Sequence, residues 1–139
     1  ASDVYKRQEQ NITKKYFINR ISKDIFNGNS IVGFLATNML DGHRSYSSAS
    51  FDNIVYFSNN LIFDYQYVKS INDKINGNAH NLNFEFDSPY PLTFLFDMES
   101  YDKNFDINKV GYNERNNIKK YKVSIGIKNT KPSLDLSLE

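Results

Sequence analysis

The chain has 139 residues, of which 40% are hydrophobic and 24% charged, a composition that is ordinary for one folded domain. Lysine and arginine number 17 against 16 acidic residues, and because the two signs are interspersed the chain lacks the basic surface that binds nucleic acid. The absence of cysteine excludes disulfides, thiolate metal sites and a cysteine nucleophile.

The amino-terminal residues do not resemble part of a natural protein. The letters DVYKRQ at residues 3–8 are the translation of GATGTGTATAAGAGACAG, the mosaic-end sequence of a common transposase-based sequencing adapter. We therefore interpret residues 1–8 as an adapter translation and expect the natural sequence to begin near Glu9. Residues 9–139 are the part from which a fold can be inferred.

Apolar and aromatic residues recur at every second position through most of this part, and Asn, Gly, Asp and Ser interrupt the runs. Period 2 is typical of a β-strand with one apolar face, whereas a helix would show a period near 3.6. The expected strands cover residues 15–23, 30–38, 50–57, 61–69, 80–87, 92–99 and 121–128, with another beginning at residue 134. The sequence predicts an all-β fold, an antiparallel up-and-down meander without helices.

The connections between these strands fall into two expected groups. Short turns are predicted at residues 27–29, 58–60 and 88–91, and Asn27-Gly28 in the first of them tolerates the positive φ angles of a tight hairpin. Longer polar loops are predicted at residues 40–48, 70–78 and 101–119. Short turns alternating with long loops are typical of membrane barrels.

Two architectures fit strands with one apolar face. In a soluble β-sandwich or small closed barrel the apolar faces point inward and the polar faces meet water. In a transmembrane barrel the arrangement is inverted, because the apolar faces meet lipid and the polar faces line the lumen. The expected segment lengths, the alternation of loops and the 21 aromatic residues (10 Tyr and 11 Phe) favour a fragment of an outer-membrane-type barrel, with the soluble sandwich as the alternative.

Three blocks of sequence add a resemblance. They are SIVGFLATN at residues 30–38, ASFD at residues 49–52 and YDKNFDINKVGYNERNN at residues 101–117. Together they resemble an uncharacterised barrel-like domain found carboxy-terminal to family-9 carbohydrate-binding modules in envelope proteins, chiefly of Bacteroidota. Relatives carry Asp-rich or Trp-bearing strands, which this chain replaces with Asn- and Tyr-bearing strands and no Trp. The most specific block places Gly111, Tyr112 and Arg115 just before a strand.

The resemblance implies a partial barrel domain, truncated at both ends, in the outer membrane of a Gram-negative bacterium. Its partners would be outer-membrane lipid, the remaining strands of the parent barrel and, through a missing amino-terminal module, carbohydrate. The expected function is a non-catalytic wall segment of a carbohydrate-handling surface protein. A soluble β-sandwich that binds a ligand and an accessory part of an envelope hydrolase are the alternatives.

Carboxylates provide the candidate chemistry. Paired carboxylates can act as general acid and base, as they do in glycosidases. The same period-2 pattern, however, places them on the polar face of any sheet, so we favour exposure to a lumen or to solvent over catalysis. The residues concerned are Asp64, Glu85, Asp87, Asp97 and Glu99.

The other polar motifs indicate no catalytic group, metal site or cofactor. His43 and His80 have no partner spacing typical of a metal site, and we expect both to be solvated. Residues 72–78 only faintly resemble a calcium loop, so we expect a hairpin tip at Asn76-Gly77. Arg115 would brace a lumen carboxylate or contact a ligand, although a structural ion pair is the favoured interpretation, with Gly111 as a turn glycine.

Overall fold

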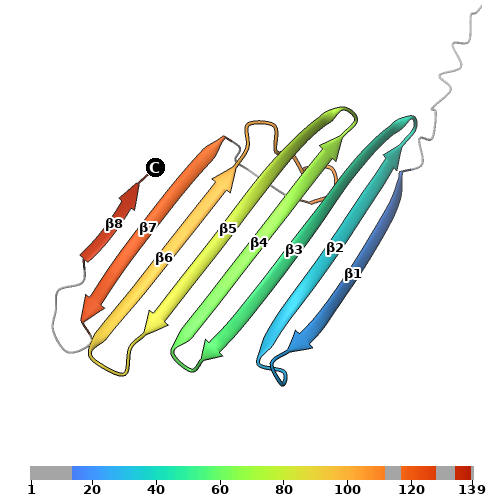
Figure 1. Cartoon of the computed structure of the whole chain (residues 1–139). Coiled ribbons are helices and arrows are strands. Elements are labelled where there is room, and N and C mark those ends of the chain that lie inside the picture. The colour runs from blue at the N-terminus through green and yellow to red at the C-terminus, as the bar shows by residue number, and fades with distance from the viewer. Residues whose placement is uncertain (1–13, 112–116, 128–133, 139) are drawn as a thin grey trace, which may run out of the picture.

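The structure is a computed structural model that describes residues 14–111, 117–127 and 134–138. Eight antiparallel strands form one sheet in the order β1-β2-β3-β4-β5-β6-β7-β8, each strand pairing with its neighbours in sequence (Figure 1). The strands are β1 (Lys15–Ile25), β2 (Ser30–Asp41), β3 (Arg44–Ser58), β4 (Leu61–Asn72), β5 (Ile75–Asp87), β6 (Leu92–Tyr101), β7 (Ile118–Ile127) and β8 (Leu134–Leu138). The predicted all-β, up-and-down meander is confirmed.

The predicted short turns are confirmed at one end of the sheet. Between β1 and β2, Phe26 and Asn27 have φ angles of 51° and 58°, and Gly28 has a φ of 85°. Positive φ is the conformation for which Asn and Gly are preferred, so Asn27-Gly28 fixes this reversal. The β3–β4 turn at Asn59-Asn60 and the β5–β6 connection at residues 88–91 lie at the same end.

Two predicted loops are wrong, because residues 40–48 and 70–78 are mostly strand. The β2–β3 reversal needs only Gly42 and His43, and the β4–β5 reversal needs only Asp73 and Lys74. The hairpin tip is therefore not at Asn76-Gly77. In consequence the regular alternation of short turns with long loops, which favoured a membrane barrel, is absent from the described connections, where the segment between β6 and β7 is the long one.

Hydrogen bonds between small polar side chains explain why the serine-rich start of β3 is a strand. Thr37 and Ser48 share a hydroxyl–hydroxyl hydrogen bond of 2.7 Å across β2 and β3, and the Asn38 amide donates to Ser47 Oγ at 2.8 Å. Cross-strand pairs of this kind stabilise a sheet without an apolar pattern. Periodicity of hydrophobic residues does not detect them.

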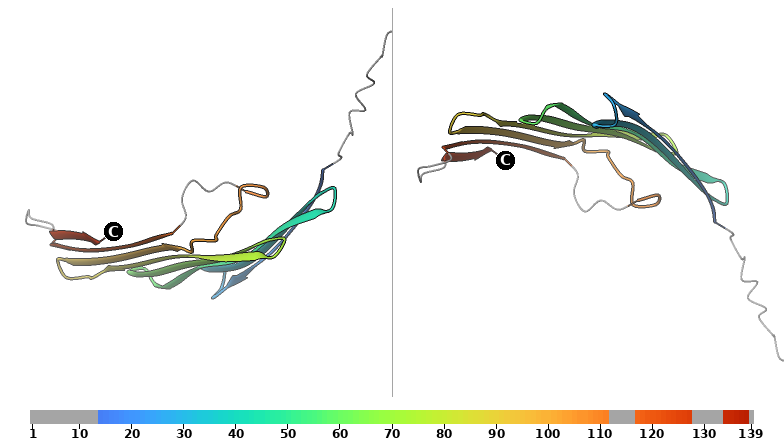
Figure 2. Two further views of the ribbon diagram at one scale, coloured as in Figure 1. Left: turned by 90° about the horizontal axis from the view of Figure 1, so that it is seen from above. Right: turned by 90° about the horizontal axis from the view of Figure 1, so that it is seen from below.

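The sheet is bowed, and the connection between β6 and β7 lies on its concave side. Both views in Figure 2 show the sheet curving around this connection, with the opposite, convex side left bare. Asn72 and Ser70 of β4 bond to the backbone of Asp106 in the connection. The sheet face that carries Ser70 and Asn72 is therefore the concave face.

Few side chains are buried, because no second layer of secondary structure covers the sheet among the described residues. The buried hydrophobic side chains are Met39, Val55, Ala79 and Phe105. Large apolar side chains such as Ile21, Phe34 and Ile125 stay between 43% and 73% exposed. The described strands thus leave an apolar face that water alone would not stabilise.

Candidate functional surface: the concave face of the sheet

The strand register assigns every residue of β1–β7 to one of two faces. Directly opposed residues share a face, and successive residues of a strand alternate between faces. Ser70 opposes Gly77, and Asn72 opposes Ile75, which places these four residues on the concave face. The same alternation carried across the ladders defines both faces of the whole sheet.

The five carboxylates singled out in the sequence lie together on the concave face. Asp64 opposes Asn83, which in turn opposes Asp97, so these three residues form one row across β4, β5 and β6. The full set of strand carboxylates on this face of β1–β7 is Asp24, Asp41, Asp52, Asp64, Glu85, Asp87, Asp97 and Glu99. No Asp or Glu of β1–β7 lies on the convex face.

The convex face is dominated by aromatic and aliphatic side chains. Its charged groups within β1–β7 are lysines near the strand ends, Lys15, Lys23, Lys69 and Lys119. The large apolar residues of its central part are Phe34, Phe51, Phe63, Tyr65, Leu82, Phe84, Phe86, Phe94, Phe96, Val123 and Ile125. Apolar residues also occur on the concave face, among them Ile18, Ile31, Ile54, Ile62, Val68 and Leu95.

Three of the concave carboxylates have polar or charged neighbours, and these do not form a catalytic pair. Asp97 accepts a 2.6 Å hydrogen bond from the Asn83 amide and opposes Lys122, and Glu99 opposes Lys120. Arg20 and Asp52 form an ion pair of 3.2 Å. Such partners are typical of the polar face of a sheet.

Asp64 differs from the other carboxylates on this face. Burial raises its pKa above the ordinary value, and the neighbouring charge of Asp52 raises it further. A single perturbed carboxyl group without an opposed nucleophile or base does not define an active site. Within the described residues, no group of three His, Cys, Asp or Glu side chains is placed to hold a metal ion.

The described part of the β6–β7 connection packs against the carboxyl-terminal end of β4 and the start of β5. Ser70 Oγ accepts a hydrogen bond from the Asp106 amide at 3.2 Å, and the Asn72 side chain donates to the Asp106 carbonyl at 2.9 Å. The Phe105 ring packs against Tyr101 with 5.6 Å between centroids and is only 2% exposed. Burial raises the pKa of the Tyr101 hydroxyl to about 12, with a hydrogen bond to Glu99 contributing.

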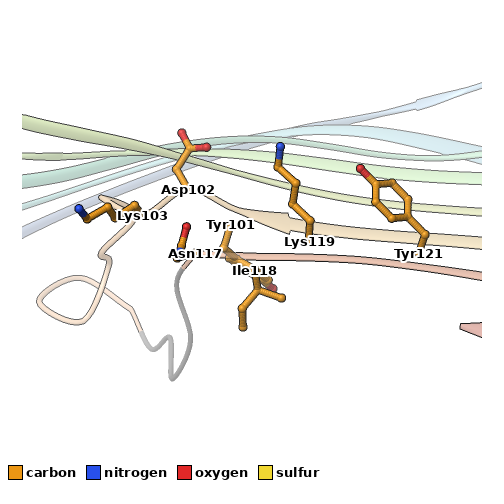
Figure 3. A pocket seen from close by; sticks show the side chains of 7 residues that line it. All are labelled: Tyr101, Asp102, Lys103, Asn117, Ile118, Lys119 and Tyr121. Carbon is orange, nitrogen blue, oxygen red and sulfur yellow. The ribbon is translucent and has the colours of Figure 1, made fainter. Parts of the chain in front are cut away.

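A hollow of about 700 Å³ lies where this connection leaves β6 and returns to β7. Figure 3 shows that its side chains point to opposite sides of the sheet, with Lys119 and Tyr121 on one side and Ile118 on the other. The Asp102 carboxylate is held by the backbone and side-chain amides of Asn78, each at 3.0 Å. Because its polar groups do not converge on one point, this hollow does not form a binding site.

The histidines and the family-like residues are dispersed. His43 is exposed in the β2–β3 turn, as expected. His80 was expected to be solvated, but it lies half-buried on the convex face, with its Nδ1 3.0 Å from the Tyr65 hydroxyl and its ring 5.0 Å from Tyr67. Gly111 is a turn residue whose amide donates to the Ile107 carbonyl at 2.6 Å. Tyr112 and Arg115 lie outside the described residues.

No sequence motif marks the residues that hold the connection in place, and the local pattern predicted Gly77 at a hairpin tip. Gly77 lies inside β5, where a Cβ would overlap the backbone of Asn104 and Phe105. A glycine within a strand is a recognised signal for close approach of another backbone. Phe105, a lone aromatic residue between polar neighbours in the expected loop, was the second available signal.

Comparisons with family models, with curated protein sequences and with solved structures give no significant match for this chain. Among the described residues there is no helix that is long and apolar enough to cross a membrane. The fold and its two faces are therefore the basis for a functional proposal.

Proposed function

We propose that this chain is a non-catalytic wall segment of an outer-membrane-type β-barrel. Its convex face contacts lipid and its concave face lines the lumen. The observation that carries the proposal is which face of the bowed sheet is aromatic and which is acidic. The bowed sheet has most of its aromatic side chains on the convex face and all the carboxylates of β1–β7 on the concave face.

A soluble arrangement predicts the opposite relation. In a soluble barrel the concave face encloses the core and carries the large apolar side chains, while the convex face meets water. Here Asp64, Asn83 and Asp97 cross the middle of the concave face. Burying such a row in an apolar core would cost several kcal/mol for each unpaired charge. Lining a water-filled lumen avoids this cost.

Strand length also supports the proposal. A tilted transmembrane strand needs roughly 9–11 residues. Strands β1–β7 contain 10 to 15 residues each. The four lysines of the convex face lie near strand ends, where their charges can reach the headgroup region.

The partners that follow are lipid and further strands. The outer edges of β1 and β8 have no partner strand among the described residues. Unpaired strand edges are not tolerated in a bilayer, so the remaining strands of a parent barrel must close the sheet. Barrels of this type are found in the outer membrane of Gram-negative bacteria, which is the proposed location. The handling of carbohydrate rests only on the three sequence blocks that resemble the Bacteroidota domain.

The parent protein is the material for the first test. Sequencing the locus across both ends of the chain is expected to replace residues 1–8 and to continue into further amphipathic strands. A reading frame that closes near residues 9 and 139 would contradict the wall-segment proposal and favour the soluble sandwich.

The test of the proposal itself uses two adjacent positions on β7. Ser124 lies on the concave face and Ile125 on the convex face, and the chain contains no cysteine. In the parent protein reconstituted in vesicles, Ser124→Cys should react with a water-soluble maleimide, whereas Ile125→Cys should react only after the lipid is removed. Equal labelling of both variants in vesicles would contradict the proposal.

A further inference from the structure

The β6–β7 connection lies across the sheet instead of extending beyond its end. The hairpin turns at the same end of the sheet, Gly42-His43 and Asp73-Lys74, are tight and leave the concave face open. Residues 102–111 instead fold back over β4 and β5 (Figure 2). This placement requires attractive contacts, because a polar segment of this length would otherwise gain entropy in water.

Hydrogen bonds fix the connection at two points. Asp102 receives hydrogen bonds from the amides of Asn78, and its own backbone amide donates to the Asn78 carbonyl at 2.9 Å. Asp106 is bound through both its amide and its carbonyl to the β4 side chains Ser70 and Asn72. Since Ser70 is fully buried, breaking the contact would leave its hydroxyl with only the 3.4 Å hydrogen bond to the Gly77 carbonyl.

Apolar residues lie between these two points. Phe105 is buried against Tyr101, and Ala79 beneath it is 5% exposed. A cavity of about 210 Å³ separates Ile107 and Phe105 from the sheet residues that line its other side, Gln66, Val68 and Asn81. The connection thus has its own small core on the concave face.

Gly77 makes this close approach possible. Any Cβ at this position would overlap the backbone of Asn104 and Phe105, so only glycine admits the connection at this depth. The sheet therefore has a position, Gly77, that is specifically suited to contact with the connection. A surface loop without specific contacts to the sheet would not require a glycine there.

We propose that residues 102–111 form the constriction of the passage enclosed by the barrel. This inference rests on the proposed function, since only in a barrel is the concave face a lumen. The charged residues that follow Asp102 in the segment, Lys103, Asp106 and Lys109, are of both signs. The constriction therefore selects hydrophilic solutes by size, and the solutes it admits are small.

The test compares three variants of the parent protein in planar bilayers. In the first, residues 104–109 are replaced by a short glycine linker. In the second, Gly77→Ala displaces the intact connection. The matched control is Gly126→Ala on the same face of β7, where the added Cβ meets only the side chain of Thr93, which can rotate away. Liposome swelling with a pentose, a hexose and a trisaccharide reports the size limit of each variant.

The linker variant is expected to conduct severalfold more than the wild type and to admit the trisaccharide. Gly77→Ala should change conductance in the same direction by less, and Gly126→Ala should match the wild type. A wild type that is closed until the connection is removed also supports the proposal. If Gly77→Ala does not fold, the linker variant alone decides.

Unchanged conductance and size limit in a linker variant that inserts as well as the wild type would overturn the constriction while leaving the barrel intact. A linker variant that inserts but conducts nothing would also overturn it. If neither protein inserts into lipid, the proposed function itself fails, and the constriction fails with it. Insertion, scored by protease protection, separates these cases.

Discussion

On the convex face of β1–β7 the charged side chains are lysines near strand ends, whereas the concave face carries every Asp and Glu of those strands. Both faces follow from the same alternation of residues, so alternation alone does not say which face is inside. The curvature of the sheet and the position of residues 102–111 identify the concave face. The difference between the faces is the basis of the proposal that the aromatic face is the outside of a barrel.

The largest expected effect comes from placing a charge on each face in turn. Phe96 lies on the convex face of β6 and Leu95 on its concave face. A lysine on a lipid-facing position costs about 2–4 kcal/mol in mid-bilayer, whereas a lumen position tolerates it. Phe96→Lys should therefore lower the urea midpoint of the membrane-folded protein far more than Leu95→Lys. Similar shifts for the two variants would contradict the difference between the faces.

The contact between the β6–β7 connection and the concave face is tested by removing the Ser70 hydroxyl. Ser70→Ala takes away the acceptor of the partly buried Asp106 amide, and the loss of such a hydrogen bond costs about 0.5–1.5 kcal/mol. Hydrogen exchange at the Asp106 amide should accelerate accordingly. Ser124→Ala lies on the same face away from the described connection and should not change exchange at Asp106. Unaltered exchange in Ser70→Ala would show that this contact does not hold the connection.

Tyr101 should make the stability of the packing between the β6–β7 connection and the sheet depend on pH. Its pKa is raised from 10.0 to about 12 because burial and the hydrogen bond to Glu99 favour the neutral hydroxyl. A raised pKa means that the stabilisation is complete below pH 10 and is lost as the pH rises through about 12. Absorbance of tyrosinate at 295 nm should show a late-ionising group in the wild type, and Tyr101→Phe should remove it. A titration at high pH that Tyr101→Phe leaves unchanged would contradict the prediction.

The smallest effect is expected at Asp64 on the bare part of the concave face. Burial and the nearby charge of Asp52 raise its pKa, so the ionised form destabilises the fold at neutral pH. Asp64→Asn should stabilise the protein slightly at pH 7, and the gain should vanish as the pH falls below the pKa of the carboxyl group. Asp97→Ala is the contrasting variant, because it loses the hydrogen bond from Asn83 and should destabilise. A loss of stability in Asp64→Asn at pH 7 would contradict the argument.

The strand order and the partition of faces could be predicted from the sequence because both depend on local patterns. Leu82, Phe84 and Phe86 alternate with polar residues, and Asn27-Gly28 marks a reversal, so the meander and the shared face of the carboxylates follow directly. The tight turns at Gly42-His43 and Asp73-Lys74 were missed. The strands beside them are held by hydrogen bonds between Ser, Thr and Asn side chains, which a hydrophobic pattern does not reveal.

The packing of the β6–β7 connection against the sheet could not be predicted, for a different reason. It depends on contacts between Phe105 and residues of β5 and β6, and on the space left by Gly77. Such contacts join segments that are distant in sequence, and no local period reports them. Curvature is likewise a property of the whole sheet, and the sequence left the lipid-facing and core-facing alternatives open.

The most direct measurement of the central claim places one tryptophan on each face of β6. The chain has no tryptophan, and Phe94 and Leu95 are adjacent residues on the convex and concave faces. In the parent protein folded into vesicles of brominated phospholipid, Phe94→Trp fluorescence should be strongly quenched and Leu95→Trp fluorescence should not. Quenching of Leu95→Trp alone, or of neither variant in a folded protein, would contradict a convex face that contacts lipid.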